Sequence, residues 1–128
     1  MTVQEAIEAA ERILPGEAAP DDEEDPRWQA IIAIGEFLDS QPESVWKFIE
    51  CWGVHPNDDL RMAIATVLLE HLLDRHFETF FPRVRQLVRE NRLFADTFSS
   101  CWKFGQSKSF ANALQFDALK REASQRAG

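Results

Sequence analysis

One helix-start pattern occurs twice in the first part of this chain. It begins at Asp25 with the letters DPRW and at Asp59 with the letters DLR, and an apolar stretch follows each. Residues 25 and 59 are 34 positions apart, so one shift superposes Asp25 on Asp59 and Arg27 on Arg61. This spacing is typical of repeats made of two helices. The pattern therefore predicts stacked helical hairpins, an architecture whose extended surfaces usually bind other molecules.

Hydrophobic periodicity indicates helices along the whole chain, and no segment shows the sustained alternation of a half-buried strand. We expect helices at about 3–14, 26–40, 41–52, 58–75, 82–91, 93–104 and 109–123. The predicted fold class is all-α: a short right-handed stack of antiparallel helical hairpins, with six to seven helices and no sheet. We expect a single domain over 1–128, made of an N-terminal helix (1–14), an acidic linker (15–25) and a helical-hairpin core (26–126).

Local signals set several of these boundaries. Asp25 is a suitable N-cap because Pro26 follows it at the first helical position. Ser40 with Glu43 resembles a capping box for the third helix. The helix from about Asp58 to Arg75 is apolar nearly all round, which predicts a central, buried position.

Aromatic residues and cysteines are expected mainly in the core. Ten Phe and four Trp contribute to a hydrophobic content of 45%. Cys51 and Cys101 each precede a Trp within an apolar helical pattern, so both are expected to pack as small hydrophobic residues. The last helix is expected to bury Phe110, Leu114 and Phe116. The four Trp residues are also expected in the core, and a Trp-lined binding groove is the alternative.

Charge is distributed unevenly. The net charge is -8, yet residues 1–60 hold 15 acidic and 3 basic side chains, whereas residues 61–128 hold 7 and 11. Such asymmetry suggests charged partners. Neither a membrane span nor a signal peptide is predicted, so we expect a soluble, cytoplasmic protein without a membrane partner. Opposite charges on the two halves also suggest a homo-oligomer held by opposite-charge faces.

The strings at Asp25 (DPRWQA) and Asp59 (DLRMA) resemble the opening of the second helix in HEAT repeats, where an Asp, an apolar-Arg pair and small residues recur. The resemblance covers about residues 25–75 and implies a HEAT-like or armadillo-like fold. In that family the Asp and Arg residues tie adjacent repeats together, and Ala residues let helices approach closely. The residues to which the resemblance gives these structural roles are Asp25, Arg27, Ala30, Asp59, Arg61 and Ala63.

A second resemblance and a basic stripe provide an alternative function. Residues 52–57 (WGVHPN) with the following helix start are similar to a repeat of DNA alkylation repair proteins, which are built from HEAT-like units. Arg85, Arg89 and Arg92 recur at i, i+4 and i+7, so one helix would display them as a stripe for phosphates or an acidic partner. An isoelectric point near 4.8 disfavours nucleic acid as that partner.

The leading hypothesis is a non-catalytic protein-binding module, either an adaptor or an immunity-like or inhibitor-like protein whose acidic face blocks a basic partner. The candidate acidic residues are Asp21, Asp22, Glu23 and Glu24. No pattern indicates a nucleophile beside a base, a phosphate-binding glycine loop or paired catalytic carboxylates. His71 and His76 would point about 140° apart on one helix, which does not suit a shared metal ion. We therefore expect no catalytic residue, no metal and no cofactor, and the protein partner stays unidentified.

Overall fold

The computed structural model describes residues 1–16 and 24–127, and every regular element within these ranges is a helix. This confirms the predicted all-α class. The elements are α1 (Val3–Ile13), α2 (Pro26–Gly35), α3 (Pro42–Trp52), α4 (Asp58–Ala63), the π-helical turn η1 (Ile64–Leu69), α5 (Glu70–Glu90), α6 (Arg92–Ser99), the 3₁₀ turn η2 (Gly105–Lys108) and α7 (Phe110–Ala127).

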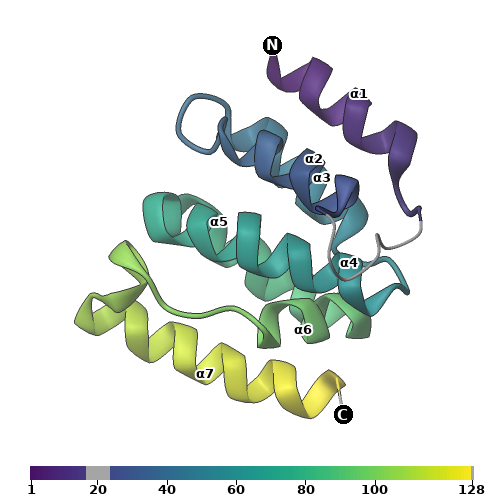
Figure 1. Cartoon of the computed structure of the whole chain (residues 1–128). Coiled ribbons are helices and arrows are strands. Elements are labelled where there is room, and N and C mark those ends of the chain that lie inside the picture. Colours follow the sequence, from purple (N-terminus) through teal and green to yellow (C-terminus); the bar gives the residue numbers. More distant parts are fainter. Residues whose placement is uncertain (17–23, 128) are drawn as a thin grey trace.

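The helices lie in successive layers between the two chain ends (Figure 1). α1 packs against α2 and α3 at one end, and α7 packs against α6, α5 and η2 at the other. The α4–η1–α5 segment lies between these ends and contacts both groups. The two terminal helices therefore each have one face without a further helix layer.

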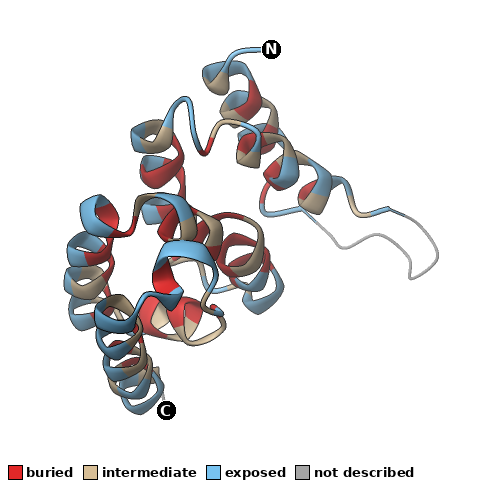
Figure 2. Cartoon of the chain, turned by 90° about the vertical axis from the view of Figure 1, so that its left-hand side faces the viewer, coloured by how far each residue is buried: buried red, intermediate tan, exposed pale blue. Residues whose placement is uncertain are grey.

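The core is continuous and mostly apolar. Buried side chains line the inner faces of the helices, whereas the outer faces of α1 and α7 are largely exposed (Figure 2). Phe98 of α6 and Phe116 of α7 meet with ring centroids 5.0 Å apart, and both side chains are at most 1% exposed. Burial of such large side chains contributes roughly 1.5–3 kcal/mol each. The apolar faces of α6 and α7 thus hold the last two helices together.

Two predictions about helix ends in the first half are wrong. α2 ends at Gly35 rather than near Ser40, because the next three backbone N–H groups bond to carbonyls three residues back and tighten the chain into turns. The N-cap of α3 is Gln41, and no capping box forms with Ser40. The predicted start of the next helix at Asp58 is confirmed: Asn57 caps α4, with its side chain accepting the Leu60 N–H at 2.9 Å.

The central segment is longer than predicted and changes geometry twice. It passes through the π-helical turn η1 and continues into α5, where the backbone breaks at His76 (φ −139°, ψ 45°). Pro82 therefore lies inside the second arm of α5, not in its first turn as predicted. The sequence predicts two separate helices at 58–75 and 82–91. In the structure the chain stays helical from Asp58 to Glu90, interrupted by the π-helical turn at 64–69 and the break at His76. The predicted burial of this segment is confirmed, because Leu68, Leu69 and Leu72 are all 0% exposed.

α6 is also shorter than predicted. It ends at Ser99 instead of near Phe104, and residues 100–104 cross back toward the start of α7 (Figure 1). The buried carboxylate of Glu70 accepts the Trp102 N–H at 2.9 Å and fixes this crossing. At its end, Gly105 has a φ of +49°, a left-handed conformation that glycine adopts at little cost.

Candidate functional site

The first Asp and Arg of the recurring pattern lie in one ion-pair cluster around the buried Arg27 side chain. The Arg27 side chain is 5% exposed and bonds to Asp25 at 2.9 Å and to Asp59 of α4 at 2.6 Å. Asp25 is also the N-cap of α2. Asp59, in contrast, lies inside the first turn of α4, so the two aspartates occupy different helix positions. Ala30 is half-buried and Ala63 is buried.

A second cluster follows one layer further along. The Arg61 guanidinium bonds to Asp58 of its own helix, to Asp96 of α6 at 2.7 Å and to the His55 carbonyl at 2.8 Å. Its side chain is 5% exposed. Arg27 therefore joins α2 to α4 and Arg61 joins α4 to α6, by the same kind of contact. The repeated helix-start pattern of this chain does not point to Asp96, because the residues around Asp96 do not match that pattern.

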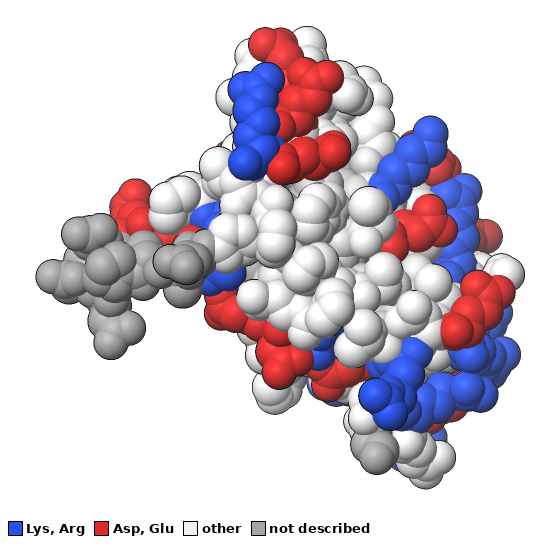
Figure 3. All heavy atoms as spheres, turned by 90° about the vertical axis from the view of Figure 1, so that its right-hand side faces the viewer, with Lys and Arg blue, Asp and Glu red and all other residues white. Residues whose placement is uncertain are grey.

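The acidic run lies mostly outside the described residues: this holds for Asp21, Asp22 and Glu23, and only Glu24 is described, as exposed. The described neighbours of the run carry both signs, with Asp25 acidic and Arg27 basic. On the face shown in Figure 3, Lys and Arg side chains gather at the lower right, with some Asp and Glu among them, and uncharged side chains cover the middle of the face. Basic side chains are therefore concentrated on one side of this surface.

The predicted basic stripe does not form on one helix. Arg92 is the first residue of α6, beyond the Asn91 cap, so the stripe prediction is wrong at this position. Arg89 pairs with Glu122 of α7 at 2.9 Å, and this contact lowers the pKa of the Glu122 carboxyl. The Arg85 guanidinium lies 5.5 Å from the Phe81 ring centroid. Two of the three arginines thus have partners within the fold.

Apolar side chains predicted to be buried are exposed on the last helix. Phe110 is 84% exposed and Leu114 is 59% exposed, so these two predictions are wrong. They lie one turn apart on α7, and we call this pair the α7 ridge. The predicted burial of Phe116 is confirmed, and the helix also buries Leu119. α7 lies at the end of the stack, so only one of its faces packs against the core. The α7 ridge lies on the opposite, exposed face.

The loop before α7 adds two further exposed aromatic rings to this end of the molecule. Trp102 is 68% exposed, contrary to the prediction, and Phe104 is 38% exposed. Basic groups accompany them: the Lys120 ammonium lies 4.9 Å from the Trp102 ring and the Lys108 ammonium 6.0 Å from the Phe104 ring. The C-terminal end of the stack is therefore both aromatic and basic.

A groove lies at the opposite end of the stack, between α1 and α3. Its volume is about 270 Å³. Its lining combines apolar groups with charged or polar ones: Gln4, Ile7, Glu11, Ser44, Lys47, Phe48, Cys51 and Trp52. Cys51 is a free, exposed thiol, so its predicted core position is wrong, whereas Cys101 is buried as predicted. Trp46 is buried, and Trp28 and Trp52 are half-buried.

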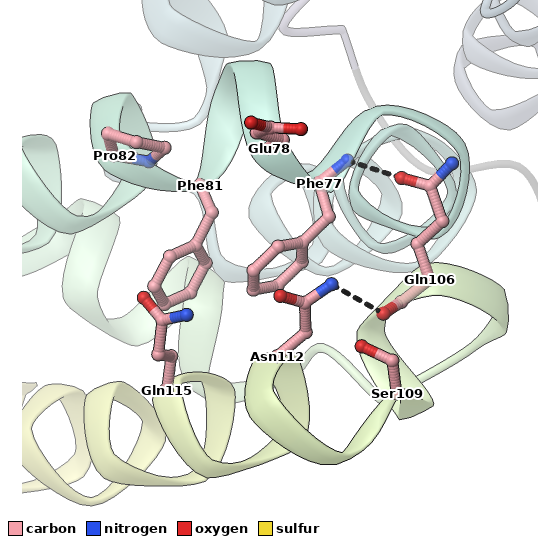
Figure 4. Close-up of a pocket in the computed structure, with 8 residues that line it drawn as sticks. All are labelled: Phe77, Glu78, Phe81, Pro82, Gln106, Ser109, Asn112 and Gln115. Atoms are coloured by element: carbon pink, nitrogen blue, oxygen red, sulfur yellow. Dashed lines mark hydrogen bonds between the residues drawn. The ribbon is translucent and has the colours of Figure 1, made fainter.

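A larger groove of about 590 Å³ separates the second arm of α5 from the start of α7. Figure 4 shows Phe77 and Phe81 pointing from α5 toward Asn112 and Gln115, which point back from α7. The Phe77 and Phe81 rings stack at 4.5 Å, and Gln106 closes one end by accepting the Phe77 N–H at 3.0 Å. The Asn112 amide of α7 donates to the Gln106 carbonyl at 2.9 Å, so Gln106 links α5 to the start of α7 across this end of the groove.

Two buried side chains outside these surfaces, Glu70 and Cys101, have raised pKa values. Burial raises the pKa of Glu70, and the hydrogen bond from Trp102 opposes this with a smaller effect. Burial also raises the pKa of the Cys101 thiol. In residues 1–16 and 24–127, no three His, Cys, Asp or Glu side chains are arranged to hold a metal ion.

None of the described helices has the length and hydrophobicity that a membrane crossing requires. Comparison with protein-family models, with curated proteins and with solved structures finds no match to this chain. The surfaces themselves must therefore indicate what the protein does.

Proposed function

We propose that this chain is a non-catalytic protein-binding module whose main binding surface is the aromatic and basic C-terminal end of the helical stack. The observation that carries the proposal is the exposure of the α7 ridge: Phe110 at 84% and Leu114 at 59%. An exposed phenylalanine alone is ordinary. Two large apolar groups that are exposed one helical turn apart are characteristic of an interaction surface.

The charges around the ridge suggest the chemistry of the partner. Lys108 and Arg121 are exposed near the two ends of the ridge-bearing half of α7. Lys103, by contrast, is paired with Asp117 at 2.9 Å. A partner that presents apolar side chains flanked by carboxylates fits this surface, because the apolar contact provides affinity and the charges provide orientation.

The scaffold behind this surface is proposed to be a short HEAT-like stack. The Arg27–Asp59 and Arg61–Asp96 contacts support this, since each ties a helix to the helix that begins the next layer. Such ties keep successive layers in register and give the terminal helix a fixed support. The acidic run at 21–24 is a second candidate surface, suited to a basic partner in an adaptor or inhibitor-like role.

Affinity capture from native lysate of the source cells, with quantitative mass spectrometry, tests the proposal. The bait variants are the wild type, Phe110→Ser/Leu114→Ser, and the matched control Ile32→Ser/Met62→Ser. Ile32 and Met62 are 43% and 44% exposed on α2 and α4, so the control replaces two exposed apolar side chains elsewhere on the surface. We expect a partner recovered by the wild type and the control to be lost from the ridge variant.

One outcome of the capture experiment would contradict the proposal. If the ridge variant recovers the same proteins as the wild type in the same amounts, the ridge is not the binding surface. Circular dichroism and urea unfolding of all three baits show beforehand that each is folded. Reversal of Glu24 and the neighbouring acids to Lys in a separate bait tests the second surface.

A further inference from the structure

This inference rests on the proposed function and names the partner of the same surface. We propose that the α7 ridge of one copy inserts into the α1–α3 groove of a second copy, so that the protein assembles head to tail. The two surfaces lie at opposite ends of the stack (Figure 1). They cannot meet within one molecule, and each end stays open for another copy.

The groove suits an aromatic side chain in size and chemistry. Its volume of about 270 Å³ is larger than a benzyl group. Ile7 of α1 and Phe48 and Trp52 of α3 supply apolar walls. Phe110 is the most exposed large apolar side chain of the described residues, and it projects from the first turn of α7. Insertion would remove both apolar surfaces from water at once, which favours association.

Charge complementarity selects a second copy over other apolar partners. Glu11 and Lys47 line the groove, and its two helices also expose Glu5, Glu8, Arg12, Glu43 and Glu50, so acidic side chains predominate there. The ridge end carries the exposed cations Lys108 and Arg121. Both groups lie beside the apolar contact, where opposite charges orient an approaching surface and raise the association rate. When two copies meet, their like-charged ends repel and their oppositely charged ends attract. The copies are therefore expected to associate head to tail.

Such an interface is heterologous, meaning that different patches of the two copies meet. A heterologous contact forms a ring when the rotation between copies closes and an open chain when it does not. The contact area is small, so we expect weak association that grows with concentration and weakens with salt.

Sedimentation velocity from micromolar to near-millimolar concentration tests this assembly with purified full-length protein. We expect the wild type to shift from monomer toward larger species, with the shift reduced between about 0.01 M and about 1 M salt. Phe110→Ala/Leu114→Ala should weaken association at least about tenfold, because burial of one large apolar side chain is worth that much. Met62→Ala is the matched control and should associate like the wild type.

A complementation experiment identifies the groove as the receptor. Cys51→Trp fills the groove from an exposed position, so it blocks the receiving end but leaves the ridge intact. The ridge variant has the reverse defect. Neither variant should assemble alone, whereas an equimolar mixture should form a heterodimer that cannot grow, since only one pair of functional ends remains.

The native thiol provides an independent measurement. Cys51 lines the groove and Cys101 is fully buried, so thiol labelling of the folded protein reports on the groove alone. Labelling of wild-type Cys51 should slow as protein concentration rises, and it should not slow in the ridge variant. This comparison does not require any change to the groove itself.

The outcomes separate this inference from the proposed function. A wild type that stays monomeric at near-millimolar concentration in low salt overturns the inference. Assembly that survives in Cys51→Trp, or that is unchanged in the ridge variant, overturns it as well. If the wild type is monomeric but its ridge still captures a different protein, the proposed function stands without self-assembly. Equal urea midpoints for the variants exclude misfolding as the cause of any loss.

Discussion

The Arg61 cluster permits a prediction in which the closer contact is the weaker one. Arg61 bonds to both Asp58 and Asp96, and its own side chain is 5% exposed. Asp58 lies closer to the guanidinium but is 90% exposed, whereas Asp96 is 50% exposed. Because water screens and rehydrates an exposed carboxylate, we expect exposure rather than distance to decide the energy of each contact.

The expected magnitudes follow from these exposures. Hydrogen bonds to charged groups contribute about 1.5–3 kcal/mol when shielded, and exposed ion pairs contribute about 0.2–1 kcal/mol. Asp96→Asn should therefore destabilise the fold by about 1–1.5 kcal/mol, and Asp58→Asn by no more than about 0.5 kcal/mol. Arg61→Met should cost about 2–3 kcal/mol, because it also leaves the His55 carbonyl without its donor.

Urea unfolding followed by Trp fluorescence measures these differences, and double-mutant cycles with Arg61→Met isolate each pair. The coupling energy between Arg61 and Asp96 should exceed that between Arg61 and Asp58 by about twofold or more. An Asp58→Asn loss equal to or greater than the Asp96→Asn loss would refute the reasoning. It would show that the short contact within α4, and not the tie between α4 and α6, stabilises this part of the fold.

Three further predictions concern single residues. Burial raises the pKa of Glu70 above its ordinary 4.5, so the folded state holds that proton more tightly than the unfolded state. The associated stability is complete below about pH 4.5 and is lost as pH rises through the raised pKa. Glu70→Gln should remove this fall in a series of urea midpoints, and an unchanged pH dependence contradicts the assignment. Gly105→Ala should lower stability by about 1–2 kcal/mol in thermal unfolding, because φ is +49° and the new Cβ would overlap the Asp74 carboxylate. Asp74→Ala in the same protein should restore part of the loss; purely additive effects would disprove the overlap. An alkylating reagent should add one group to the native chain, at Cys51, and a second at Cys101 only after denaturation. Two adducts on the folded protein by intact mass would show that Cys101 is accessible.

Hydrophobic periodicity and capping signals predict the all-α class, and the resemblance to HEAT repeats implies that Arg27 and Asp59 help tie helices together. The structure brings these two side chains together. The π-helical turn could not be predicted, because its shifted hydrogen bonds have no residue signature comparable to a cap or a proline. The pairing of Arg61 with Asp96 was also missed, since it depends on how α6 packs across α4.

Predictions of burial failed mainly where a helix has no outer neighbour. Hydrophobic periodicity shows which faces of a helix could be covered, but it does not show whether another element is present to cover them. α6, which lies between two layers, buries Phe94 and Phe98 as its pattern indicates. α7 lies at the end of the stack, and its second apolar face remains open at Phe110.

The absence of a covering element over Phe110 in the described part of the chain is the reason to consider the α7 ridge a candidate binding surface. Exposed apolar groups lower solubility, and a polar residue at position 110 would satisfy the fold equally well, because Phe116 and Leu119 already fill the contact with the core. Packing within the chain therefore does not account for Phe110, and this supports the proposed intermolecular contact. The same argument does not apply to the α5–α7 groove, whose Phe77 and Phe81 rings are at most 3% exposed and are accounted for by packing. The ridge and the α5–α7 groove thus differ in whether their apolar side chains already pack within the chain, and this difference makes the ridge the better candidate of the two for a binding surface.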